Sequence, residues 1–222
     1  GIFFKDGIAE FFIAYKDGQP AGTLCLAEEK QRTRHLGHAE CMFGFFECID
    51  DYEVFTAMFA HAETWARARN MTAFYGPFNL DREDSRGILI EGRDRPPAIY
   101  CGHHPPYYRE FFERYGFVKH DDDGVAYMVN IDLSSPRLQK LSRVVERVRE
   151  KHPEYHVRGA NIKDMDAEID RILYLQNVGL AHFPGHVPYT RADIESIILP
   201  LLDLVDLELV LLAEDNGKPA GF

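Results

Sequence analysis

The sequence of 222 residues has little that suits a secreted, membrane-spanning or nucleic-acid-binding protein. Its four cysteines, Cys25, Cys41, Cys48 and Cys101, show no paired spacing, which is typical of a reduced chain with incidental thiols. No apolar run approaches the roughly 18 residues that span a bilayer, and there is no signal-peptide pattern. The net charge of -11 disfavours a general nucleic-acid binder. We therefore expect a cytoplasmic protein with no nucleic-acid and no membrane partner.

What the sequence does contain is enough apolar material for a normal core. The hydrophobic fraction is 45%, and the length fits one large domain or parts of two. The chain starts at Gly1 and stops at Phe222 inside a predicted strand, so we expect a fragment of a longer protein.

The stretch from Glu40 to Asn79 gives the clearest prediction of secondary structure in the sequence. Residues 40–49 are apolar with little alternation, which indicates a strand buried on both faces. Asp50 is a candidate N-cap for a helix that runs to about Asn70, followed by a strand over 72–75. One face of the helix carries its apolar residues: Val54, Phe55, Met58, Phe59, Ala62, Trp65 and Ala66. A strand, helix and strand in this order form a parallel crossover, and ligands bind beyond the carboxyl ends of such strands. That end is where Glu47 lies.

A predicted hairpin occurs twice. Asp17-Gly18 separates the apolar runs 10–15 and 21–26, a strong hairpin signal. Five of its small or turn residues recur 199 positions later, within 209–222. Two explanations stay open: a repeated fold, or convergence on the same turn chemistry.

The remaining elements follow from local patterns. We expect a polar connection over 29–38, a helix from Tyr107 to Tyr115 ended by Gly116, strands at 117–119 and 125–131, a helix from Ser135-Pro136, a strand at 155–158, and helices over 164–180 and from Thr190 to Leu202. His35 and His38 fit solvated loop residues better than metal ligands, and Asp121–Asp123 fit a solvated turn better than a calcium site. We expect no metal. The aromatic segment 98–108 is either a pocket wall or a plug over the sheet.

The helix after Ser135 combines an apolar stripe with basic residues. The stripe is Leu138, Leu141, Val144, Val145 and Val148, and the cations are Arg137, Lys140, Arg143, Arg147, Arg149 and Lys151. Such a helix either binds an anionic partner or connects two domains with a solvated basic face; the connector is the commoner case.

The order of elements, joined at the shared hairpin, resembles the GNAT fold of the acyl-CoA N-acyltransferases. The segment Phe111 to Phe117, ending in Tyr-Gly-Phe, looks like that family's last-helix motif. Residues 75–79 and 104–108 look like those of a bacterial group of uncharacterised proteins with two GNAT-like halves. The resemblance implies an α/β fold, with a mixed central sheet flanked by helices, in tandem copies that are both incomplete. It assigns residues 1–133 to the first copy, 134–152 to a connecting helix and 153–222 to the second.

The resemblance also implies a reaction and a site. The family transfers an acyl group from acetyl-CoA or another acyl-CoA to an amine, here a small-molecule or peptide amine. Glu47 matches the carboxylate base, and Tyr108 substitutes for a general-acid tyrosine whose place is taken by Phe112. Glu47 bonded to nearby backbone in a structural role is the alternative. The substrate pocket is expected at Phe46, Asn79, His103, His104 and Tyr107.

The expected cofactor turn departs from the family pattern. Residues 49–55 contain no glycine and three acids, and acids at a helix N-terminus repel a phosphate. We therefore assign no cofactor-binding residue, and place the chemistry either at Glu47 or in the second copy. The rival functions are a non-catalytic GNAT-like module that binds a ligand or partner through the loops between Asn79 and Tyr108, and a transferase that uses charged tRNA, which the acidic balance disfavours.

Overall fold

The computed structural model describes residues 2–80, 86–98, 101–121, 123–132, 134–183, 186–202 and 204–222, except the side chain of Leu207. It divides the chain into two compact units, 3–126 and 127–222. The predicted boundaries at 133 and 152 stay predictions, as does the identity of the units as two copies of one fold.

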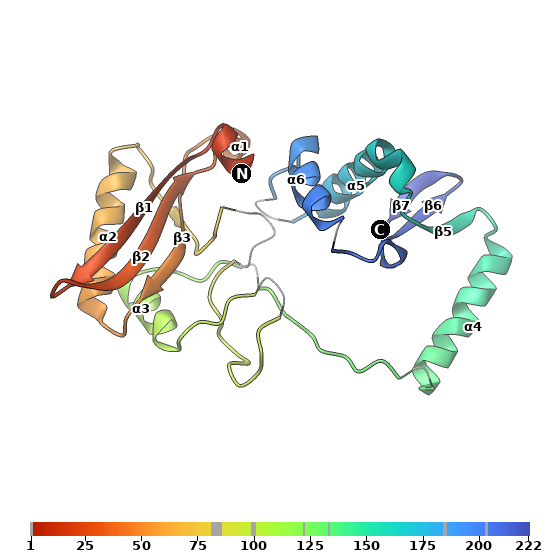
Figure 1. Ribbon diagram of the computed structural model, residues 1–222, viewed down its shortest axis with the longest axis horizontal. Helices are drawn as coiled ribbons and strands as arrows, with labels where there is room; N and C mark the ends of the chain where they lie inside the picture. Colours follow the sequence, from red (N-terminus) through yellow and green to blue (C-terminus); the bar gives the residue numbers. More distant parts are fainter. Residues whose placement is uncertain are drawn as a thin grey trace. The chain divides into compact units, whose positions relative to one another are not determined.

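The first unit is a mixed α/β structure, as predicted (Figure 1). Its elements are β1 (Ile8–Lys16), β2 (Gln19–Glu28), α1 (Lys30–Leu36), β3 (Cys41–Cys48), α2 (Tyr52–Arg67), β4 (Phe74–Tyr75) and α3 (Tyr107–Tyr115), after a 3-10 turn, η1 (Ile2–Lys5). The sheet order is β1-β2-β3-β4, antiparallel except for the parallel pair β3–β4. The predicted crossover of strand, helix and strand is confirmed.

Helix α2 covers one face of this sheet with the seven residues that its periodicity predicted, all buried. Their aromatic rings pack on rings from β3 and α3; for example, the Phe55 and Phe112 ring centroids lie 5.1 Å apart. Helix α3 ends at Gly116, whose φ of 109° requires glycine at that position, so that predicted stop is confirmed as well.

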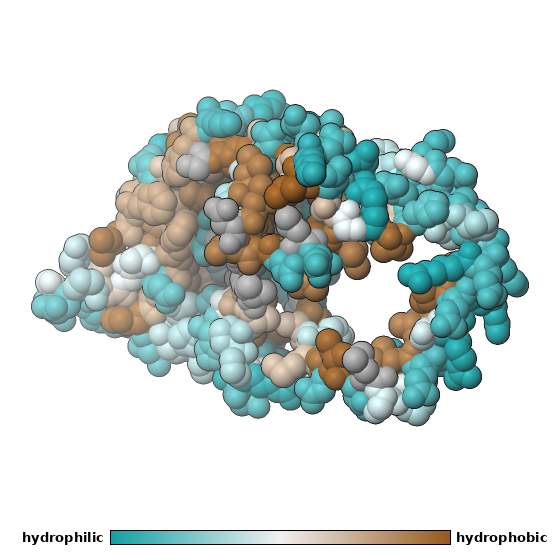
Figure 2. Space-filling model, turned by 45° about the vertical axis from the view of Figure 1, so that its right-hand side comes forward, coloured by the Kyte–Doolittle hydropathy of each residue, from teal (hydrophilic) through white to brown (hydrophobic). Residues whose placement is uncertain are grey.

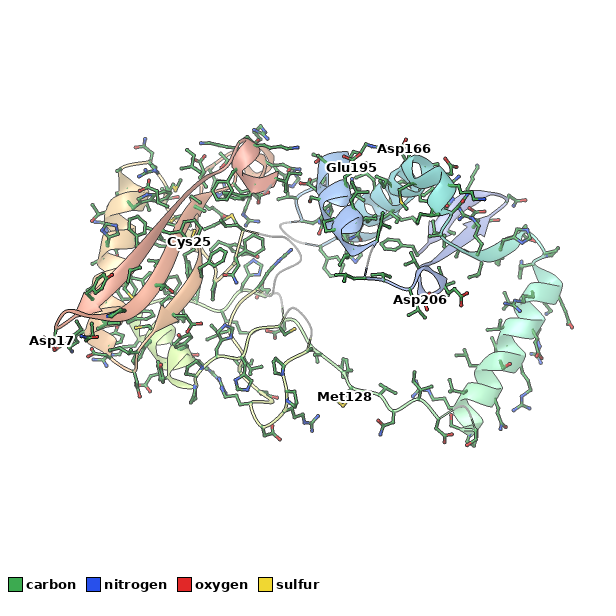
Figure 3. The ribbon with its side chains drawn as sticks, viewed as in Figure 1. Asp17, Cys25, Met128, Asp166, Glu195 and Asp206 are labelled. Carbon is green, nitrogen blue, oxygen red and sulfur yellow. The ribbon has the colours of Figure 1, made fainter. Side chains whose placement is uncertain are left out.

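The second unit contains the other elements: α4 (Pro136–Lys151), β5 (Tyr155–Gly159), η2 (Ile162–Asp164), α5 (Met165–Leu180), α6 (Arg191–Leu201), η3 (Leu207–Leu209), β6 (Leu211–Asp215) and β7 (Lys218–Gly221). Strands β5, β6 and β7 form an antiparallel sheet. Arg158 on β5 bonds Glu168 on α5 at 2.7 Å and Glu214 on β6 at 2.7 Å, so one guanidinium ties the sheet to its helix. Arg191 on α6 likewise pairs with Asp166 on α5 at 2.5 Å. Asp166 is labelled in Figure 3.

The two hairpins share their geometry. Asp17, at the tip of the first (Figure 3), and Asn216, in the second, both have φ of 51°, and a glycine with positive φ follows each. Both ladders have a register shift at the same place, after Ala14 in one and Ala213 in the other.

Several predictions about the elements are wrong. The segment 29–38 does connect β2 to β3, but it contains α1, which was not predicted. Helix α2 is capped by Asp51 rather than Asp50 and ends at Arg67. The strands at 117–119 and 125–131 do not form; Met128 lies in a segment without regular structure (Figure 3), and Ile131 is 82% exposed. Their apolar pattern specifies a strand only where an edge can pair with it. β4, the edge nearest in sequence, stops after two residues because Pro77 has no N–H to continue a ladder.

Candidate functional site

The carboxyl end of β3 contains a β-bulge. Thr23 pairs with Glu47 and Cys25 with Gly44, so Phe45 and Phe46 together oppose the single residue Leu24. Phe45 takes a φ of 45°, which is uncommon for a bulky residue. Its carbonyl accepts the Thr23 hydroxyl at 2.7 Å, and its N–H donates to Asn79 Oδ1 at 2.6 Å. The hydrogen bond from Asn79 therefore stabilises the bulged conformation of Phe45. The next residue, Phe46, is buried in the core and packs against Tyr108, with ring centroids 5.0 Å apart.

Two glycines let the chain after β4 cross directly against β3. A Cβ added to Gly44 would lie 2.0 Å from the carbonyl oxygen of Phe78, and one added to Gly76 would lie 2.3 Å from that of Phe43. The Phe78 N–H donates to the Phe43 carbonyl at 2.7 Å. This close backbone approach is what places Asn79 on the bulge.

Glu47 and Tyr108 meet at the end of β3, although 61 residues separate them. The Tyr108 hydroxyl donates to Glu47 Oε2 at 2.7 Å and accepts the Cys48 N–H at 2.9 Å. The neighbouring Tyr107 donates to the Cys48 carbonyl at 2.8 Å. The N–H and the carbonyl of Cys48 are thus both hydrogen-bonded by adjacent tyrosines on α3. Tyr108 is 1% exposed, whereas the Glu47 residue is exposed.

This environment fixes the protonation of Tyr108. Burial, and then the hydrogen bond to Glu47, raise the pKa of the Tyr108 hydroxyl well above its usual value. Burial likewise raises the pKa of Tyr107. Tyr108 therefore keeps its proton at neutral pH and serves as a hydrogen-bond donor to the Glu47 carboxylate.

His104 comes next to this pair, and His103 does not. The His104 ring centroid is 6.0 Å from that of Tyr108. Its Nδ1 accepts the Leu89 N–H at 3.0 Å, so the neutral ring carries its proton on Nε2. Burial lowers the pKa of His104, which favours that neutral form. His103 is exposed and bonds the Arg93 carbonyl at 3.0 Å.

The N-terminus of α2 is occupied by a side chain of the protein itself. The Asp51 carboxylate accepts the N–H groups of Glu53 at 2.9 Å and Val54 at 3.3 Å, and it pairs with Lys16. The hydrogen bond from Lys16, together with the smaller effect of the two backbone N–H groups, lowers the pKa of the Asp51 carboxyl. These are amides that would otherwise be available to a pyrophosphate. The residues present at this turn therefore do not fit that group.

Some predicted features fall elsewhere. Residues 81–85, Ile99, Tyr100 and Asp122, parts of the expected loops, lie outside the described residues. Among the residues that the structure does describe, no group of three or more metal-ligating side chains occurs. No helix in the described part of the chain is both long and apolar enough to cross a bilayer.

Of the predicted site residues, the structure brings together Glu47, Tyr107, Tyr108 and His104, with Phe46 behind them and Asn79 on the bulge. Their roles stay predictions. Sequence reasoning missed Asp51 as the cap, and it missed Gly44. A lone glycine inside an apolar strand was the available signal of a close backbone approach.

Comparisons with known proteins identify two relatives. No family model matches the chain, and no solved structure matches it. The chain is 31% identical over 216 residues to "Protein YghO" of Escherichia coli. The aligned region covers 97% of the chain and 54% of that protein. It is 29% identical over 225 residues to "Bacterial ceramide synthase" of Caulobacter vibrioides, covering 99% of the chain and 56% of that protein. The chain thus spans about half the length of the curated relatives it matches.

Proposed function

We propose that the protein is an N-acyltransferase, and that its first unit holds the acceptor amine at Glu47. The observation that carries the proposal is the Glu47 carboxylate, exposed at the end of β3 and bonded by Tyr108. The relative named as a ceramide synthase supports it, because a ceramide is an amide of a long-chain amino alcohol. A long-chain amino alcohol is accordingly the acceptor class we propose.

In this proposal Glu47 accepts a proton from the amine. The amine nitrogen forms a bond to the carbonyl carbon of an acyl thioester, the carbon–sulfur bond breaks, and the sulfur leaves as a thiolate. A carboxylate that is solvated on one side and hydrogen-bonded on the other can bind an ammonium group and then take its proton directly or through one water. Tyr108 is a positioning residue here, because its hydroxyl is buried and keeps its proton.

The acyl donor is proposed to be an acyl-CoA, with its phosphates held outside the turn at α2. Asp51 occupies the amides of Glu53 and Val54, and the neighbouring Asp50 adds charge that repels phosphate. The same charge favours a cationic amine at this end of the sheet. The donor site is therefore assigned to another part of the full-length protein.

The test measures amide formation by the full-length protein. It would be incubated with a long-chain amino alcohol and a long-chain acyl-CoA, and amide and free thiol would be measured together. Glu47→Gln should lower kcat/KM by roughly 10²-fold or more, since it removes the base but keeps the shape. Glu53→Gln, which removes an exposed carboxylate from the same end of the sheet, is the matched control. Equal activity of Glu47→Gln and wild type would show that Glu47 is not the base.

One observation favours a second candidate, a non-catalytic binding module. The Cys48 backbone groups and the first amides of α2 are already bonded by Tyr107, Tyr108 and Asp51. A site closed in this way can bind an amine without turning it over. Amine binding that depends on Glu47, with no amide formed from any acyl-CoA, would support the module.

A further inference from the structure

Helix α4 has an apolar stripe that the described structure leaves largely uncovered. Leu141 is 56% exposed, Val144 47%, Val145 42% and Val148 40%. These residues recur three and four positions apart, so they share one side of the helix. In Figure 2, brown side chains follow one side of this helix and teal ones the other. Four exposed aliphatic side chains on one side of a helix form a continuous apolar patch, unlike the isolated apolar residues that are common on protein surfaces.

The same helix is strongly basic in an acidic chain. It carries six cations and two acids, Glu146 and Glu150, which gives a net charge of +4, against -11 for the whole chain. Among the described residues, none of the six cations takes part in an ion pair. Lys140 lies one turn before Val144, and Lys151 lies one turn after Val148, so both flank the stripe. Their exposed ammonium groups can reach past the stripe on flexible stems.

We propose that α4 docks on the surface of an anionic phospholipid bilayer, with its apolar stripe among the upper acyl chains and its lysines at the headgroup phosphates. The charge selects this occupant, because an anionic headgroup layer complements a +4 helix. The aliphatic stripe selects a bilayer over a nucleic acid, whose phosphates would leave Leu141 and Val145 in water. This departs from the expectation that the protein has no membrane partner, and it requires no membrane-spanning segment.

The experiment is flotation of the full-length protein with vesicles. Vesicles that contain phosphatidylglycerol should carry the protein to the top of the gradient, and vesicles of phosphatidylcholine alone should not. Added salt should weaken the binding, since the attraction is screened within a Debye length. Equal binding to both kinds of vesicle, or none to either, would overturn the proposal.

Two double variants test the two parts of the surface. Lys140→Gln with Lys151→Gln should weaken partitioning roughly thirtyfold. Its matched control is Lys163→Gln with Lys218→Gln, which removes the same charge from exposed positions elsewhere in the unit and should leave partitioning nearly unchanged. A similar loss in both variants would assign the effect to net charge and overturn the role of α4.

Leu141→Gln with Val145→Gln removes the centre of the stripe and keeps good helix formers in place. It should abolish flotation with no change in melting temperature. The control is Val178→Gln with Leu199→Gln on α5 and α6, where the exposed fractions of 58% and 48% are comparable. A lower melting temperature for the α4 variant alone would show that another part of the protein covers the stripe, and would overturn the proposal.

Discussion

Replacing Tyr108 with phenylalanine isolates the hydroxyl that joins α3 to the end of β3. The ring stays, so its packing against Phe46 is kept and no cavity forms. Two hydrogen bonds are lost: the one to the Glu47 carboxylate and the one from the Cys48 N–H. The variant therefore measures the free energy contributed by these two hydrogen bonds, without a change in packing.

The two losses differ in size. Glu47 is exposed, so water replaces the lost donor and the cost is about 0.5 kcal/mol. Cys48 is 5% exposed, and its N–H is left without that acceptor, which costs about 1–3 kcal/mol. Together they should lower the opening free energy of the end of β3 by roughly 1.5–3.5 kcal/mol.

Native-state hydrogen exchange of the Cys48 amide is the suitable assay, because it reports local opening without requiring the whole protein to unfold in one step. Tyr107→Phe is the control. Its hydroxyl donates to the Cys48 carbonyl from a half-buried position, so its loss should cost under about 1 kcal/mol. A Tyr108→Phe effect no larger than that of the control would refute the reasoning.

Three further predictions concern other parts of the fold. Gly44→Ala should destabilise the first unit by about 2 kcal/mol or more, because its Cβ would meet the Phe78 carbonyl; Gly124→Ala, which meets nothing within 4 Å, is the control in thermal unfolding, and equal melting temperatures would contradict the expected clash. Glu168→Ala should cost about 2 kcal/mol, since the half-buried Arg158 guanidinium loses its buried partner but keeps Glu214; urea unfolding of the second unit measures it, and no measurable cost would show that the ion pair is dispensable. Burial and the Glu63 bond raise the pKa of Tyr115 to about 12, so the unfolded chain loses this proton first and stability should fall as the pH rises from 10 towards 12; the part that Tyr115→Phe removes should be about 1–2 kcal/mol, and an unchanged alkaline profile would contradict the assignment.

Local chemistry was sufficient to predict most elements. The Asp-Gly turn, the α2 apolar face, Gly116 at the end of α3 and the Thr190 cap all act within a few residues. Each was found in the expected place. Local signals failed at the start of α2, because Asp50 and Asp51 are both residues that a helix N-cap prefers and the sequence alone does not choose between them.

Contacts between distant residues were harder to predict. The parallel crossover placed Glu47 at the end of the sheet, but no pattern in the sequence paired it with Tyr108 through Cys48. The bulge at Phe45 depends on Asn79, 34 residues away, and on the backbone approach that Gly44 permits. The strand predicted over 125–131 failed for the related reason that pairing depends on a partner edge, which apolar alternation alone does not specify.

The end of β3 suits a positively charged ligand better than a negatively charged one. Glu47, Asp50 and Asp51 gather there, and among them the Asp51 carboxylate has its own partners in Lys16 and two amides. An anion entering this end would have to displace Asp51 from the helix terminus as well as overcome the repulsion. A cation displaces nothing, because Glu47 keeps its Tyr108 bond through one oxygen and has a second oxygen to offer. The end of β3 is therefore better suited to a cation than to a phosphate, and under the proposed function this asymmetry is the physical reason to place the amine, and not the phosphates of the acyl donor, at Glu47.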